Sequence, residues 1–200
     1  MKHLKNICVI ALAAIVTAAV SAGTASATTL EVGGVTKNEK VSLTMSLRPD
    51  SSAFWQPTGG GSLVTTCTKS HVEGHTETPY TGHEVGGPVT LMTFSECTDG
   101  GITVVFGGYL SFTHIEGTTS GTVTSRNTEV KVPSPIGTLT CRTNNGVDIG
   151  TLTGATTAGN PGQHAIMDIN GVINCGFLLP SAEWKGEYIV TSPTELGVSA

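Results

Sequence analysis

The sequence of 200 residues contains little charge, few aromatic side chains and no long apolar run. Charged residues make up 12% of the chain, about half of the usual ~25%. So low a charge content argues against a disordered polyampholyte and against a basic nucleic-acid-binding protein. No apolar stretch reaches the ~20 residues that a membrane-spanning helix needs, which excludes a polytopic membrane protein.

The common signatures of catalysis and cofactor binding are also absent. The chain has no Gly-Xaa-Ser-Xaa-Gly nucleophile elbow, no His-Glu-Xaa-Xaa-His zinc motif, no phosphate-binding loop and no dinucleotide-binding glycine pattern. Each of these motifs places a nucleophile, a metal or a phosphate group in a defined local geometry. From their absence we expect a protein that is not an enzyme, with no catalytic residues and no cofactor.

Met1–Ala27 is typical of a secretory signal peptide. Lys2 and Lys5 give a positive start, a 14-residue apolar stretch follows from Ile7 to Val20, and Ala25–Ala27 offers small residues to signal peptidase. Cleavage removes two of the ten basic residues and none of the fifteen acidic ones, which changes the formal charge from −5 to −7. We therefore expect an acidic exported chain, 28–200, that forms one domain and keeps no transmembrane segment.

Four cysteines remain after cleavage, an even number that predicts two disulfides in an oxidising compartment. Four cysteines allow three pairings, but "SLVTTCT" resembles "GTLTCRT", and "VTLMTFSEC" resembles "MDINGVINC". An internal duplication of this kind pairs Cys67 with Cys97 and Cys141 with Cys175. A zinc site is the alternative, and the lack of any Cys-Xaa-Xaa-Cys pair disfavours it.

Alternation with a period of two recurs along the chain, whereas the helical period does not. In Val41–Leu47 every second residue is apolar and the others are Ser or Thr, which predicts a half-buried strand. The dipeptides Asp99-Gly100 and Asn170-Gly171 are typical of turns. We expect an all-β fold, an antiparallel β-sandwich of jelly-roll or Ig-like topology, with a β-barrel as the alternative.

Two local segments depart from this strand pattern. Ser51–Gly61, which contains "FWQPTGGG", is expected to be a flexible loop, and Ser181 could cap one short helix near "LPSAEW". A loop position would leave Trp55 exposed, and an exposed indole ring can stack on a sugar. Trp55 is thus the candidate residue for ligand binding, in a carbohydrate-binding module.

One short segment concentrates imidazoles and carboxylates. His71, His75 and His83 alternate with three glutamates within a few residues, and such a set can bind zinc or copper. Glycine and proline residues in the same segment weaken the preorganisation that a metal site requires. We expect a solvated segment between two strands and no bound metal, with these three histidines as ligands if a metal is found.

The cysteine-bounded stretches "CTKSHVEGHTETPYTGHEVGGPVTLMTFSEC" and "CRTNNGVDIGTLTG…MDINGVINC" carry a resemblance. The chain resembles small secreted bacterial all-β proteins of unassigned function, and also the exported protein activator of alkane oxidation group. This resemblance implies a non-enzymatic protein at the cell surface and transfers no functional residue. We expect surface binding or adhesion to cell-envelope or matrix components, with no nucleic-acid partner. A carbohydrate-binding module and a secreted hydrolase are the alternatives.

The signal-peptide prediction can be tested on the exported protein. We expect its amino terminus to be Thr28, because Ala25 and Ala27 occupy the two positions that signal peptidase reads. Amino-terminal sequencing and intact mass measure this directly. An Ala27→Arg variant should remain uncleaved, and a mature protein that still begins at Met1 would contradict the prediction.

Overall fold

The computed structural model describes residues 27–59, 65–77, 82–135, 137–155 and 163–200, and in these ranges the chain forms fifteen strands and no helix. The alternation in the sequence explains the strands. In β14 (Ala182–Ser192) each second side chain is buried from Ala182 to Val190 and those between are half-buried. No helix in the described part is long and apolar enough to span a bilayer.

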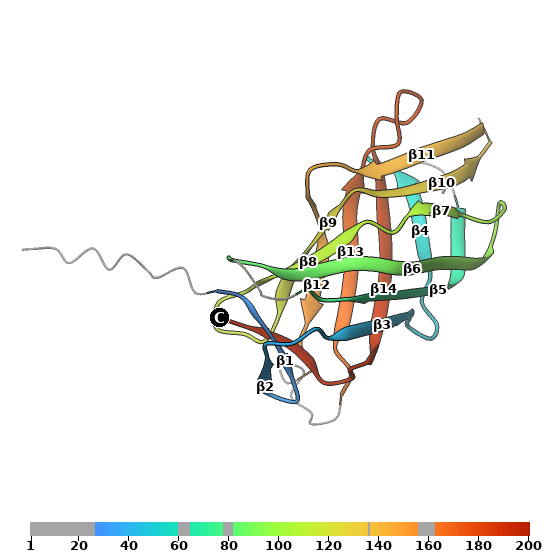
Figure 1. Ribbon diagram of the computed structural model, residues 1–200. Helices are drawn as coiled ribbons and strands as arrows, with labels where there is room; N and C mark the ends of the chain where they lie inside the picture. Colours follow the sequence, from blue (N-terminus) through green and yellow to red (C-terminus); the bar gives the residue numbers. More distant parts are fainter. Residues whose placement is uncertain (1–26, 60–64, 78–81, 136, 156–162) are drawn as a thin grey trace, which may run out of the picture.

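Eight of these strands close into an antiparallel barrel (Figure 1). The strands follow one another around the barrel in chain order, and β14 completes the ring because it pairs with β13 on one edge and with β3 on the other. The barrel strands are β3 (Ser42–Leu47), β5 (Thr65–His75), β6 (Val85–Cys97), β8 (Tyr109–His114), β9 (Gly121–Arg126), β12 (Val147–Thr153), β13 (Ile166–Ile173) and β14.

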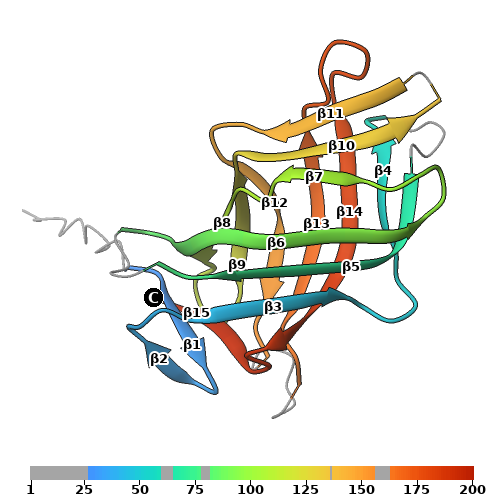
Figure 2. The same cartoon turned by 45° about the vertical axis from the view of Figure 1, so that its right-hand side comes forward.

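The remaining strands extend this barrel. The short strand β4 (Ala53–Pro57) pairs with β14 and β5 beyond the end of β3. β7 (Thr103–Phe106), β10 (Thr128–Ser134) and β11 (Gly137–Thr143) form a sheet near one end. β1 (Thr29–Val32), β2 (Val35–Lys37) and β15 (Leu196–Ser199) form a small sheet near the other, as Figures 1 and 2 show.

The all-β prediction is confirmed, and the barrel alternative describes the main sheet where the sandwich was expected. Other local expectations were wrong. Part of the expected loop is β4, the region of the expected helix begins β14, and Asn170-Gly171 lies within β13. The glycine has a different role there, because its backbone packs closely against Ile149. A Cβ atom at Gly171 would lie 2.7 Å from Ile149 Cα.

Both predicted disulfides are present, but they hold different parts of the fold. Cys67 and Cys97 lie directly opposite each other on β5 and β6. Cys141, on β11, is bonded to Cys175, which follows β13, and so ties the β7–β10–β11 sheet to the end of the barrel. The pairing that the duplication predicted is thus confirmed, although the two bonds do not occupy equivalent places in the topology.

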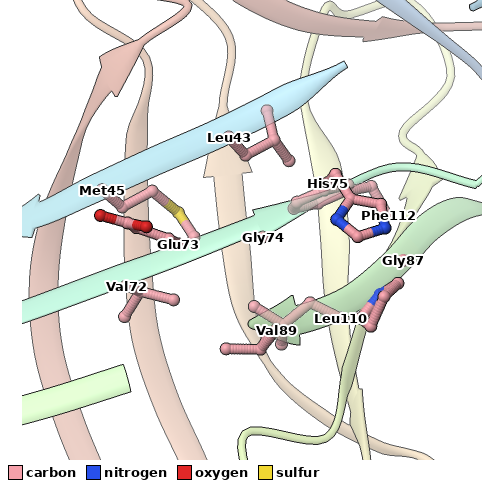
Figure 3. A pocket seen from close by; sticks show the side chains of 11 residues that line it. Leu43, Met45, Val72, Glu73, Gly74, His75, Gly87, Val89, Leu110 and Phe112 are labelled. Carbon is pink, nitrogen blue, oxygen red and sulfur yellow. The ribbon is translucent and has the colours of Figure 1, made fainter. Parts of the chain in front are cut away.

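Side chains fill the interior of the barrel. The rings of Trp55 and Trp184 stack at 5.7 Å between centroids, and Phe94 meets the Trp55 ring edge-on at 5.0 Å. The hydroxyl of Tyr188 donates a hydrogen bond to Ser70 Oγ at 3.1 Å, and complete burial raises the pKa of this tyrosine. Between the described side chains lie spaces such as two of about 10 Å³ each. The first, shown in Figure 3, lies among apolar side chains of β3, β5, β6 and β8.

Close backbone contact between β6 and the end of β5 gives a stability test. A Cβ atom at Gly87 would lie 1.7 Å from the carbonyl oxygen of His75, so the strands must move apart to admit it. We expect Gly87→Ala to lower the free energy of unfolding by about 3 kcal/mol.

Urea denaturation of the oxidised protein measures this loss. Gly101→Ala is the matched control, because nothing lies within 4 Å of a Cβ atom at that position. Equal stability of the two variants would contradict the contact.

Candidate functional site

The clearest arrangement of reactive side chains lies on the outer face of β3 and β5. Ser46 and His71 are direct cross-strand partners, and His71 and Glu73 point to the same side because Val72 between them is buried. His71 Nδ1 is 3.2 Å from Ser46 Oγ, and His71 Nε2 is 2.9 Å from Glu73 Oε1. Three strand residues thus form a continuous hydrogen-bonded chain.

The chemistry of these groups sets the direction of both hydrogen bonds. An ionised carboxylate only accepts, so Nε2 of His71 must carry the proton that it shares with Glu73. In the neutral imidazole the other nitrogen, Nδ1, then holds a lone pair, and the Ser46 hydroxyl donates to it. This is the order of roles in a serine–histidine–carboxylate triad, although the two ring nitrogens are exchanged.

An open depression of about 320 Å³ adjoins this chain of residues. Both Ser46 and His71 line it, together with Lys69 and the hydroxyl-bearing Thr93 and Ser95. The Lys69 ammonium lies 2.5 Å from Glu96 Oε1, and this contact, with a hydrogen bond from Thr68, lowers the pKa of the exposed Glu96 carboxyl. The depression therefore offers hydrogen-bond donors of several kinds to a bound molecule.

The three predicted metal ligands are separated in space or occupied by other contacts. His71 is bonded through both ring nitrogens, His75 lines the small apolar space of Figure 3, and His83 is exposed beyond residues 78–81, which lie outside the described ranges. Among the described residues no three His, Cys, Asp or Glu side chains form a group that could hold a metal ion.

The predicted sugar-binding residue is in the wrong place for that role. Trp55 is only 1% exposed to solvent, because it points into the barrel from β4 and stacks on Trp184. Its neighbour Phe54 points outward and lines a second open depression, of about 410 Å³, over β4, β13 and β14. Asn170 and Lys185 lie in the same cross-strand row as Phe54.

In the next row of this depression two carboxylates oppose each other. Asp168 is the direct cross-strand partner of Glu187, an arrangement of like charges that is unfavourable. Arg48 compensates Glu187 with an ion pair, and Ser51 donates to the backbone oxygen of Glu187 at 3.3 Å. Carboxylates, an amide, an ammonium and an aromatic ring thus meet on one outer surface.

A third feature is an apolar tip in the loop between β13 and β14, formed by Phe177 and Leu178. Their exposed fractions are 97% and 65%. The loop is anchored by the disulfide at Cys175, and the backbone N–H of Gly176 donates to Asn174 Oδ1 at 3.0 Å. Figures 1 and 2 show this loop projecting beyond β11. Two large apolar side chains are thus held in solvent by an anchored loop.

One half-buried polar cluster has a structural role. Arg126 donates to Glu84 Oε2 at 2.7 Å and to Ser111 Oγ at 3.0 Å, which satisfies a serine that is fully buried. The hydrogen bond from Arg126 is the main cause of the lowered pKa of Glu84. This cluster joins β8 and β9 to the residues that precede β6.

Comparison with known proteins identifies no relative: no family model, no curated protein and no solved structure matches this chain at a significant level. The resemblance stated from the cysteine-bounded stretches therefore remains a prediction, and function has to be argued from the geometry alone.

The expectation of no metal stays a prediction, which elemental analysis of untagged protein can test. We expect less than a tenth of an equivalent of zinc or copper, because both ring nitrogens of His71 already have partners. One equivalent of metal, lost in His71→Ala or His75→Ala and retained in a His164→Ala control, would contradict it.

Proposed function

We propose that the chain is a secreted or cell-surface protein that acts by binding a partner through its outer surface. The single observation that carries this proposal is the apolar tip of Phe177 and Leu178, two exposed side chains in a loop that a disulfide anchors at Cys175. Side chains fill the interior of the barrel. We therefore place the contacts with a partner on the described outer faces and loop ends. Binding of this kind requires no catalysis and no cofactor.

The chemistry of the tip favours a protein partner with an apolar pocket. Burial of one such side chain is worth about 1.5–3 kcal/mol, and an aromatic residue inserted into a pocket is a frequent centre of a protein interface. The segment from Ile169 to Ala182 carries no charge, whereas the chain as a whole is acidic. An acidic protein is repelled by anionic lipid, which disfavours insertion of the tip into such a membrane.

The two disulfides support an extracellular location, since such bonds persist in oxidising compartments. The partner in this proposal is a component of the cell envelope or of the matrix, as the sequence led us to expect.

Saccharide binding is a second candidate function, which the depression around Phe54 favours. A sugar ring presents an apolar C–H face and several hydroxyl groups. The Phe54 ring can pack against the C–H face, while Asp168 and Asn170 offer the acceptors and donors that the hydroxyls need. In this alternative the expected aromatic platform exists, but it is Phe54 that supplies it and not Trp55.

A paired binding experiment tests the main proposal. The exported, oxidised protein is immobilised and probed with cell-envelope fractions and a panel of matrix proteins. We expect the double variant Phe177→Ser, Leu178→Ser to bind about 30-fold more weakly, the factor that corresponds to a 2 kcal/mol interface hot spot. The matched control is Phe106→Ser with Val35→Ser, two residues that are 62% and 59% exposed elsewhere on the surface.

Equal binding by the tip variant and the control would contradict the role of the tip, and no binding by the native protein to any fraction would contradict the proposal. A glycan array run in parallel distinguishes the second candidate, because only saccharide binding at the Phe54 depression should be lost in Phe54→Ala and kept in Phe106→Ala.

A further inference from the structure

We infer that Ser46 is an activated nucleophile that accepts acyl groups from small carboxylic esters. The inference goes beyond the proposed binding function and uses neither the apolar tip nor the Phe54 depression. It rests on the bonded order Ser46–His71–Glu73, in which the carboxylate directs the imidazole proton away from the serine.

The sheet holds these groups in place without help from a loop. β3 and β5 are paired from Ser42 to Ser46, and β5 is paired with β6 on its other side, so that His71 lies between Ser46 and Thr93 in one row. The hydrogen bonds to Ser46 and Glu73 orient the imidazole ring, which therefore needs little reorganisation to receive a proton. Preorganisation of this kind is what makes a general base effective.

The reaction can be written with all atoms balanced. Ser46 Oγ attacks the ester carbonyl carbon while its proton passes to His71 Nδ1. The tetrahedral adduct collapses and breaks the bond to the leaving oxygen, which takes the proton from His71 and departs as the alcohol. A solvent water, deprotonated by His71, then attacks the carbonyl carbon of the Ser46 ester. The bond between this carbon and Ser46 Oγ breaks, Oγ takes the proton back from His71, and the carboxylic acid is released.

Each neighbouring group has a defined part in this scheme. Glu73 is a positioning residue that stabilises the imidazolium during transfer. Lys69, Thr93 and Ser95 line the same depression and can donate to the oxygen that becomes negative. The depression is open, and the His71 side chain that lines it is 36% exposed. Such a site admits small, flexible esters and has no enclosed pocket that selects a long acyl chain.

A fluorophosphonate probe, which reacts with activated serines, tests the inference on the exported, oxidised protein. We expect one probe per chain, mapped to Ser46 by peptide mass spectrometry, and hydrolysis of p-nitrophenyl acetate. Ser46→Ala should abolish labelling, and His71→Ala should slow it about 100-fold, the lower end of what a general base contributes. The controls are Ser42→Ala, an exposed serine on the same strand as Ser46, and His75→Ala, on the same strand as His71.

The role of Glu73 needs a readout that a merely structural residue would not move. Glu73→Gln should slow labelling about tenfold, and Glu73→Asp, which keeps a carboxylate, should recover part of that rate. The rate falls in Glu73→Gln because the imidazolium that forms during proton transfer loses its anionic neighbour, while the other facing charge, Lys69, stays paired with Glu96. Unchanged thermal unfolding of all variants shows that the fold is intact.

No reaction of the native protein with the probe, labelling at another serine, or an unchanged rate in Ser46→Ala would overturn the inference. The binding proposal is read in a separate assay, so either can fail alone. If the expected labelling and hydrolysis are found, the expectation from the sequence that this chain is not an enzyme is wrong.

Discussion

Closure of the barrel through β14 is the constraint on which the rest of the structure depends. Unpaired strand edges expose rows of backbone N–H and C=O groups, and a closed sheet removes them. β14 satisfies both of its edges, with β13 along eight residues and with β3 and β4 on the other side. Its inward row, which includes Trp184 and Tyr188, supplies much of the apolar core.

Closure also separates the inside of the barrel from its outer faces. An eight-stranded barrel is just wide enough for side chains to fill it or for one small ligand to enter. Here the tryptophan pair and the surrounding aliphatic residues take that space. On the outer faces, the strand register holds cross-strand pairs such as Ser46 and His71 at a fixed spacing.

The two disulfides reinforce different levels of this architecture. The Cys67–Cys97 bond joins partners that the β5–β6 ladder already brings together. The Cys141–Cys175 bond lies beside the isolated bridge between Arg142 and Asn174, which also joins β11 to the segment after β13. The second bond therefore constrains both the β7–β10–β11 sheet and the base of the exposed Phe177 tip.

The sequence by itself determined what short-range pattern can determine: an all-β chain and the alternation of inner and outer residues within strands. It left three cysteine pairings open, of which the similarity between the two halves favoured the one that the structure shows. It could not distinguish a barrel from a sandwich, because both bury the same alternate residues and differ only in whether the last strand returns to the first. The position of Trp55 was predicted wrongly for a related reason. An aromatic residue in a glycine-rich segment is typical of a loop, and only the pairing of β4 with β14 makes this segment a strand. Asn170-Gly171 was likewise predicted as a turn.

The contact between Ser46 and His71 joins residues 25 positions apart, and only the register of β3 against β5 sets which serine faces which histidine. Register depends on the closure of the whole sheet, and so the contact between Ser46 and His71 was decided by tertiary structure alone.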